Sequence, residues 1–246
     1  MTDLKQHQKD LLELLLKFDS ICKENGIRYW LDSGTLLGAV RHSGFIPWDD
    51  DIDVCILDSD YSKAKKLLKA NSHPPFEYQT SHKGQTRLCP RFVDNSKSIT
   101  RSVSWSPTPK TEPIWIDTFI VRSSSLRAKH LIDPLYGRCV RRLCGGIHDG
   151  ALKCIGAALL FPPIWIAKEF AILIGKFKNT GELVHDFGMP YYSIRKKKDI
   201  FPLSEVEFEG HKFPAPADPD SYLKLIYGDY MTLPEDKDKT DHNIQF

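Results

Sequence analysis

Hydrophobic and polar positions recur along the first half of the chain with two periods, and these predict its helices and strands. Apolar residues at helical spacing predict a helix over residues 4–24, which the Asn25-Gly26 pair ends. Short apolar or alternating runs predict strands, and Asp58-Ser59-Asp60 is typical of a helix start. The expected strands cover residues 27–31, 52–57, 76–79, 87–93 and 114–121, and helices are expected from Leu36 and from Tyr61. This order of elements favours a mixed α/β core.

The second half of the chain is expected to contain a helical insertion at about residues 126–185. Its central part, residues 151–177, is rich in apolar side chains. We expect Pro162-Pro163 and the charged pair Lys168-Glu169 to interrupt this part, which argues against a helix that crosses a bilayer. Packing on a core is the expected role, and a peripheral membrane contact is the alternative.

The C-terminal part returns to short elements. Residues 201–230 predict short strands and a helix that ends at Tyr227-Gly228. The charged stretch after Pro234 is expected to be loosely ordered, and the basic run from Arg195 to Lys198 is expected to be a solvated loop.

The composition is that of a soluble globular protein, with 41% hydrophobic and 27% charged residues among 246. This length suits one sizeable domain, here residues 1–246. The 34 basic and 32 acidic residues give a net charge of +2, which disfavours general nucleic-acid binding. The polar N-terminus has no apolar signal segment, so the expected location is the cytoplasm.

The chain has six cysteines, which in the cytoplasm are expected to be reduced thiols. Four residues lie close enough in sequence to suggest a zinc site: Cys139, Cys144, His148 and Cys154. No Cys-x-x-Cys pair is present, and an apolar helical segment begins within the set. Ordinary thiols are therefore the favoured interpretation, and zinc is the alternative.

A cluster of carboxylates carries the main chemical signal. Asp49, Asp50, Asp51 and Asp53 crowd into five positions, and a divalent cation such as Mg²⁺ or Mn²⁺ is their natural counter-charge. Asp51 and Asp53 project from the same face of a strand. Asp117 is the one acid inside an apolar strand, so it is expected to complete the site. A solvated acidic turn is the plain alternative, since the spacing does not fit an EF-hand.

A second signal is the small turn Ser33-Gly34-Thr35, which stands between an expected strand and an expected helix. Backbone N–H groups and a hydroxyl at a helix N-terminus suit a phosphate group. The turn and the carboxylates together predict phosphoryl or nucleotidyl transfer.

These residues carry a resemblance to a known family. The run LDSGTLLGAVRHSGFIPWDDDID, from Leu31 to Asp53, resembles a near-identical run in the LicD family, which includes the fukutin-type proteins. Similar matches occur at Arg91-Phe-Val-Asp94 and Trp115-Ile-Asp117, and in a C-terminal signature between Val206 and Pro234. The resemblance is weakest at about residues 122–185.

The resemblance implies an α/β (α+β) fold of the nucleotidyltransferase type, with a mixed sheet flanked by helices. It implies Mg²⁺ or Mn²⁺ ligation by Asp51, Asp53 and Asp117, with Asp117 as an alternative proton acceptor. Gly34 and Thr35 would occupy the phosphate cradle. Arg41 and Arg91 are candidate diphosphate contacts, and a surface or ion-pair role is equally open for each.

The implied function is the transfer of phosphocholine, or of a polyol phosphate, from a CDP-linked donor to a glycan or lipid-linked glycan. Two alternatives stay open. One is a nucleotidyltransferase that acts on a small acceptor and releases pyrophosphate. The other is a non-catalytic glycan- or lipid-binding module on the same scaffold.

Overall fold

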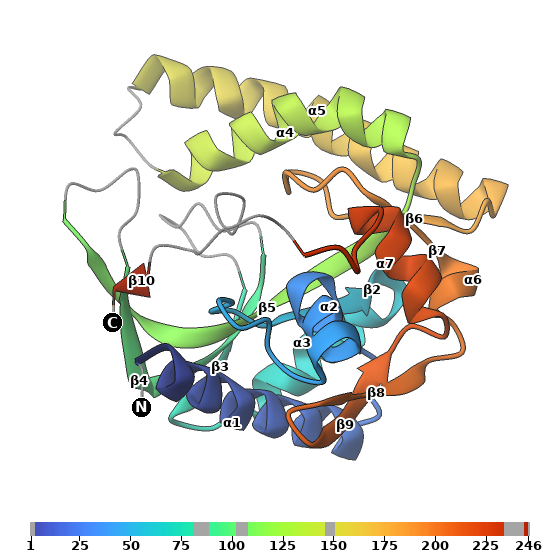
Figure 1. Ribbon diagram of the computed structural model, residues 1–246. Coiled ribbons are helices and arrows are strands. Elements are labelled where there is room, and N and C mark those ends of the chain that lie inside the picture. The colour runs from blue at the N-terminus through green and yellow to red at the C-terminus, as the bar shows by residue number, and fades with distance from the viewer. Residues whose placement is uncertain (1–2, 81–88, 102–107, 146–150, 234–243, 246) are drawn as a thin grey trace.

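The computed structural model describes residues 3–80, 89–101, 108–145, 151–233 and 244–245. Its strands are β1 (Trp30–Leu31), β2 (Asp53–Leu57), β3 (Phe76–Gln79), β4 (Arg91–Arg101), β5 (Lys110–Ser123), β6 (Glu182–His185), β7 (Ile194–Lys196), β8 (Ser204–Phe208), β9 (His211–Ala215) and β10 (Ile244–Gln245). Its helices are α1 (Asp3–Glu24), α2 (Ser33–His42), α3 (Asp58–Asn71), α4 (Leu126–Gly145), α5 (Ala151–Lys178), α6 (Lys197–Ile200) and α7 (Pro219–Tyr227). The mixed α/β class predicted from the sequence is confirmed (Figure 1).

One curled sheet forms the centre of the molecule (Figure 1). Among the described residues, β1, β2, β5, β4 and β10 lie side by side in that order, and β3, β6 and β7 extend the sheet. β2 and β5 are parallel, and the other neighbouring pairs are antiparallel. This topology places the start of β2, the middle of β5 and the start of β4 next to one another.

Helix α1 confirms the helix expected over residues 4–24. Its apolar stripe is almost fully buried: Leu11, Leu14, Leu15, Phe18 and Ile21 are each at most 2% exposed. Burial of one such side chain stabilises the fold by about 1.5–3 kcal/mol. The helix ends as expected at Asn25-Gly26, where Gly26 adopts a φ of 60°. α1 therefore serves as a rigid support for the sheet.

The C-terminal elements confirm the expected short strands and helix. β8 and β9 form a separate antiparallel hairpin, and α7 ends at Tyr227. The hairpin is fixed to the turn after α2, because Glu209 donates its backbone N–H to the Ser43 carbonyl and accepts the Phe45 N–H on its carboxylate. The charged stretch after Pro234 lies outside the described residues, apart from β10.

Three expectations in the second half of the chain are wrong. The insertion contains α4 and α5, but its last residues, Glu182–His185, form strand β6 on the sheet. The Pro162-Pro163 pair does not interrupt α5, which continues through both prolines while the Phe161 ring stacks on Tyr136 of α4. The basic run Arg195 to Lys198 is not a loop, since β6–β7 pairing and α6 order it.

Candidate active site

The sheet register brings three predicted site residues into one row. Asp53 of β2 lies beside Asp117 of β5, and Arg91 of β4 lies on the other side of Asp117. The Arg91 Nε donates to Asp117 Oδ1 at 2.7 Å, and the Trp115 indole N–H donates to Asp117 Oδ2 at 3.0 Å. The Arg91 guanidinium also lies 4.0 Å from the centre of the Trp115 ring. Asp117 is therefore held in a fixed orientation beside Asp53.

The pKa of Asp53 is raised by its burial and by the neighbouring carboxylates. Burial raises its pKa well above the usual carboxyl range, and the charges of Asp51 and Asp117 raise it further, followed by smaller effects of Asp32 and Asp49. The acidic loop that precedes β2 is held by α1, because Gln8 donates to the Asp49 carbonyl and His7 hydrogen-bonds the Asp50 carbonyl. The fold thus holds these carboxylates together against their mutual repulsion.

This donor set fits a hard divalent cation. Asp51 and Asp53 line one cavity, and Asp117 is the register partner of Asp53. Carboxylate oxygens are the ligands that Mg²⁺ and Mn²⁺ prefer, and a bound cation would relieve the repulsion that raises the pKa of Asp53.

The N-terminus of α2 forms a second wall of the site. The helix begins at Ser33, so the expected Ser33-Gly34-Thr35 turn is its first turn. Ser33 adopts a φ of 47°, an uncommon conformation for a residue with a side chain. Asp32 occupies the N-cap position but makes no side-chain cap hydrogen bond. The N–H groups of this turn have no carbonyl one turn earlier within the helix, which suits an anionic group.

Gly34 and Thr35 have different surroundings. Gly34 lines the cavity, and a Cβ added to it would lie 2.9 Å from Asp49 Oδ2, so the backbone approaches the acidic loop closely. Thr35 is 2% exposed and its hydroxyl accepts the Asp53 backbone N–H at 2.8 Å. Thr35 therefore joins α2 to β2, and its phosphate contact stays a prediction.

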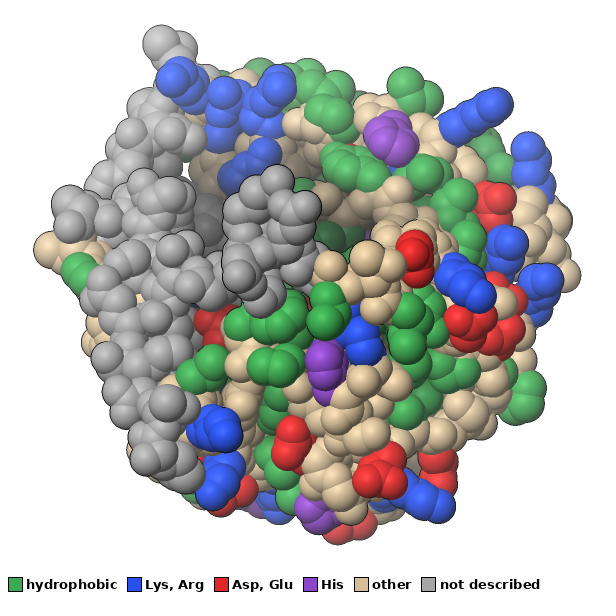
Figure 2. All heavy atoms as spheres, viewed as in Figure 1, with side chains coloured by type: hydrophobic (Ala, Val, Ile, Leu, Met, Phe, Trp, Pro, Cys, Tyr) green, Lys and Arg blue, Asp and Glu red, His purple; other side chains and the backbone are tan. Residues whose placement is uncertain are grey.

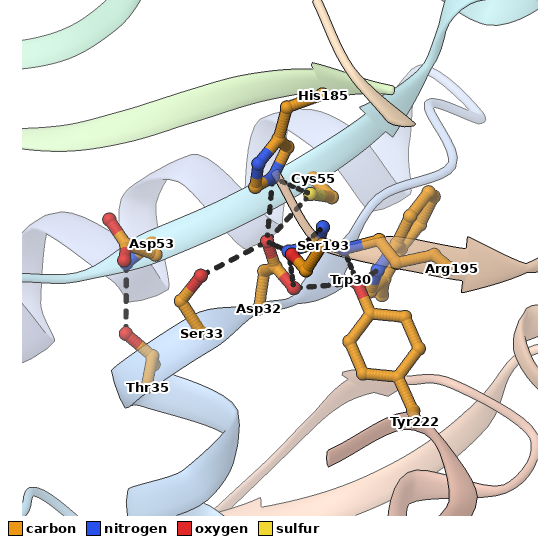
Figure 3. Close-up of polar contacts among 10 residues, drawn as sticks. All are labelled: Trp30, Asp32, Ser33, Thr35, Asp53, Cys55, His185, Ser193, Arg195 and Tyr222. Carbon is orange, nitrogen blue, oxygen red and sulfur yellow. Dashed lines mark hydrogen bonds and ion pairs between the residues drawn. The ribbon is translucent and has the colours of Figure 1, made fainter. Parts of the chain in front are cut away.

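A buried network lies directly behind this turn (Figure 3). Its centre is Asp32, which is fully buried. The Arg195 Nη2 donates to both carboxylate oxygens, at 3.1 and 2.8 Å, and the Tyr222 hydroxyl donates to Oδ1 at 2.6 Å. The Ser33 hydroxyl and the Cys55 thiol donate to Oδ2 at 3.2 and 3.0 Å. The network therefore ties β7 and α7 to the start of α2.

The charges in this network are balanced by pairing. Burial alone would raise the pKa of Asp32, but the Arg195 charge and the hydrogen bonds of His185 and Tyr222 hold it well below the usual range. Burial and the Arg195 charge lower the pKa of His185 to about 4, so this imidazole is neutral near pH 7. Burial raises the pKa of the Cys55 thiol well above its usual value.

Asp32, Cys55 and His185 also offer three potential metal-ligand atoms within 4.8 Å of one another. We favour a structural role for this triad over a metal site. Asp32 is fully buried and both of its oxygens already accept the several hydrogen bonds described above, so neither offers an open position to a metal. The Cys55 thiol would also have to lose a proton that burial holds firmly.

A cavity of about 580 Å³ lies in front of these walls. Four aromatic residues line it: Trp48, Tyr191, Tyr227 and Tyr230. Carboxylates also line it: Asp49, Asp51, Asp53 and Asp229. Aromatic faces next to carboxylates favour a cationic, weakly hydrated group.

The predicted residues divide into two sets. Asp51, Asp53, Gly34 and Arg41 line the cavity, and Arg41 also donates to the Tyr230 carbonyl at 2.9 Å. Thr35, Arg91 and Asp117 lie behind the lining residues, where Arg91 has the ion-pair role left open above.

Several residues of the site were missed by the sequence reasoning. Asp32 and Tyr222 lie inside the quoted motifs. Arg195 could have been found from the Ile194-Arg195-Lys196 run, because in a strand the middle side chain points to the opposite face from its two neighbours. His185 stands in no motif that the sequence reasoning singled out. The alternative of a zinc site is not tested, since His148 and the Cys144 side chain lie outside the described residues.

Comparison with known proteins points to one group. Residues 26–141 match the family described as LicD/FKTN/FKRP, nucleotidyltransferase domain. The chain is 28% identical to the lipopolysaccharide cholinephosphotransferase LicD of Haemophilus influenzae over 98% of its own length and 96% of that protein. A segment of 47 residues is 47% identical to the human ribitol 5-phosphate transferase FKRP, covering 19% of this chain and 10% of that protein. The mouse ribitol-5-phosphate transferase FKTN is 40% identical over 57 residues, covering 23% of this chain and 12% of that protein.

Proposed function

This chain contains a LicD-family nucleotidyltransferase domain, and from that premise we propose that it transfers phosphocholine from a CDP-linked donor to a glycan acceptor. The observation that carries the choice of phosphocholine is the cavity, where aromatic side chains and Asp229 adjoin the carboxylates of Asp51 and Asp53. A polyol phosphate such as ribitol phosphate is the second candidate, supported by the similarity to FKRP and FKTN.

The donor diphosphate would lie between the carboxylates and the start of α2. Asp51, Asp53 and Asp117 would hold Mg²⁺ or Mn²⁺, which neutralises diphosphate charge and fixes its orientation when bound. The first-turn N–H groups of α2, at Ser33 and Gly34, would bind phosphate oxygens. Arg41 on the cavity wall is suited to a further phosphate contact.

The choline group would lie against the aromatic side of the cavity. Trp48, Tyr191 and Tyr227 line the cavity, and their rings would contact the quaternary ammonium. The carboxylate of Asp229 would add negative charge. A polyol would instead form hydrogen bonds at several hydroxyls, and lining residues such as Ser193 and Thr232 could supply them. The choice of choline therefore rests on the aromatic residues that adjoin the carboxylates.

The surroundings of Asp117 favour metal binding over proton transfer. Both of its oxygens accept hydrogen bonds from N–H donors, which hold the carboxylate in one orientation beside Asp53. The glycan acceptor and the cytoplasmic location stay part of this proposal.

Calorimetric titration with CDP-choline and CDP-ribitol, in MgCl₂ and in EDTA, tests the proposal. We expect metal-dependent binding, tighter for CDP-choline, and loss of that preference in Tyr191→Ala. Asp53→Asn should abolish metal-dependent binding, whereas Asp60→Asn, which changes a carboxylate paired with Arg28 on the surface, should not. Tighter binding of CDP-ribitol would assign ribitol phosphate, and not phosphocholine, as the transferred group. Absence of binding to both nucleotides would contradict a CDP-linked donor.

Product analysis separates the remaining alternatives. Transfer of phosphocholine releases CMP, whereas a nucleotidyltransferase that uses a nucleoside triphosphate releases pyrophosphate. Binding of glycan without release of either product would favour the non-catalytic module.

A further inference from the structure

Helix α5 carries an apolar stripe on its outer face. Ile155, Leu159, Ile166, Phe170, Leu173 and Phe177 are 57%, 73%, 60%, 61%, 51% and 86% exposed. Their spacing of three, four or seven residues places them on one side of the helix. This stripe is continuous along most of α5, a helix of 28 residues that is about 42 Å long at 1.5 Å per residue.

The opposite face of α5 is fixed to the rest of the protein. Ala157 and Ile172 are buried, and Lys176 pairs with Asp58 of α3 at 2.9 Å. A Cβ on Gly175 would lie 2.3 Å from the Ser123 carbonyl oxygen, so helix and sheet touch there. By length and composition α5 could cross a bilayer, but one of its faces is packed along the domain. Helix α5 is therefore packed along the domain on one side, and only its outer face is exposed.

Positive charge surrounds the stripe. α4 and α5 together hold nine of the 34 Lys and Arg residues of the chain, and only two of its 32 Asp and Glu residues. Arg127, Arg138 and Arg141 of α4 are exposed. In Figure 2, hydrophobic side chains adjoin Lys and Arg side chains along the upper edge, where Figure 1 shows α4 and α5. Lys129 and Lys168 are buried in ion pairs, and the remaining seven basic residues still give the α4–α5 hairpin a local excess of positive charge beside its apolar face.

Helix α4 of the same hairpin is joined to the cavity. The connection between β6 and β7 runs beneath α4, where the Tyr192 ring stacks on His130 of α4 with centroids 4.6 Å apart. The preceding residue, Tyr191, lines the cavity. The hairpin and the candidate active site are thus linked by two consecutive residues, Tyr191 and Tyr192.

We propose that the α4–α5 hairpin is a membrane-docking surface that lies flat on an anionic lipid bilayer. The apolar stripe would enter the boundary between headgroups and acyl chains, and the flanking Lys and Arg side chains would contact lipid phosphates. An anionic bilayer fits this surface better than a second copy of the chain does, because two hairpins with the same excess of positive charge repel each other. The proposal does not depend on which donor the cavity binds.

Vesicle flotation tests the surface. The full chain should float with vesicles that contain phosphatidylglycerol, bind phosphatidylcholine vesicles more weakly, and dissociate as salt is added. The double variant Phe170→Gln/Phe177→Gln should reduce partitioning by roughly tenfold or more, since two large apolar groups no longer enter the lipid. The matched control is Met231→Gln/Leu233→Gln, which changes two residues of 57% and 59% exposure outside the hairpin.

Four outcomes would overturn the proposal. The first is no binding to either vesicle by a folded chain, and the second is equal flotation of the Phe170/Phe177 variant and the wild type. The third is a dimer in light scattering that the variant converts to monomer, without flotation, which would assign the stripe to a second copy. The fourth is resistance of the bound protein to alkaline carbonate, which would indicate a spanning helix. Circular dichroism and thermal unfolding establish that the variants are folded.

Discussion

Arg195 and Asp32 are 163 positions apart, yet the Arg195 Nη2 contacts both oxygens of the Asp32 carboxylate at 3.1 and 2.8 Å in the interior of the protein. Arg195 is 1% exposed and Asp32 is fully buried. Asp32 is the residue directly before the first turn of α2, so this ion pair fixes the wall of the cavity to strand β7.

Removal of the Asp32 charge should destabilise the protein strongly. Asp32→Asn leaves the Arg195 cation buried without its counter-charge, and loss of one partner of a buried pair costs about 3–5 kcal/mol. The free energy of unfolding in urea measures the effect. The control is Asp60→Asn, which breaks a pair with the largely exposed Arg28 and should cost less than about 1 kcal/mol. Equal effects of the two variants would contradict a stabilising role for the buried pair.

The neutral His185 predicts an acid-sensitive fold. Its surroundings in the folded state are Asp32, Arg195, Cys55 and, more distantly, Lys129, and burial lowers its pKa from 6.5 to about 4. The unfolded chain therefore binds a proton more readily, so stability is complete above pH 6.5 and falls as the pH drops toward 4. The contribution of this one residue is about 3 kcal/mol.

The measurement is the free energy of unfolding of wild type and His185→Gln between pH 4 and 8. The difference between the two curves isolates His185 from the carboxylates that also titrate. We expect the variant to lose less stability on acidification. Parallel curves would show that the pKa of His185 is not lowered in the folded state.

Gly34 should be required for donor binding and not for folding. In Gly34→Ala the methyl group would meet Asp49 Oδ2, which lies 2.9 Å from the ideal Cβ position, and would narrow the cavity at the start of α2. Asp49 is a short side chain that can move, so the fold should survive while donor affinity falls at least about tenfold. The control is Gly156→Ala in α5, where no atom lies within 4 Å of the added Cβ. Unchanged donor affinity in Gly34→Ala would remove the α2 terminus from the site.

The Trp115 indole should affect metal affinity through Asp117. Trp115→Phe retains a ring beneath Arg91 but removes the N–H that donates to Asp117 Oδ2 at 3.0 Å. Partners of metal ligands commonly change affinity by about 10–100-fold. We expect the MgCl₂ concentration at half-maximal thermal stabilisation to rise by about tenfold. Trp165→Phe, in the half-exposed position on α5, is the control, and an equal shift there would contradict the effect of the indole N–H.

The sequence by itself determined the local elements and predicted a cation site. The apolar stripe of α1 and the short apolar runs of β2 and β5 are local patterns. A run of apolar residues at helical spacing predicts a helix, and a short run of β-branched and apolar residues predicts a buried strand. The carboxylates of Asp51 and Asp53 were recognisable because crowded negative charge needs a cation. The LicD resemblance followed from the run that begins at Leu31, and comparison confirmed it.

Only the tertiary structure decided which distant residues meet. The basic run at Arg195 has the composition of a solvated loop, yet sheet pairing with β6 turns its first residue toward Asp32. His185 became part of the site because β6 pairs with β5. The register of β2, β5 and β4 aligned Asp53, Asp117 and Arg91, which assigned Arg91 to an ion pair. Such partners depend on strand order and register. These result from contacts between residues far apart in the sequence, so no local pattern reveals them.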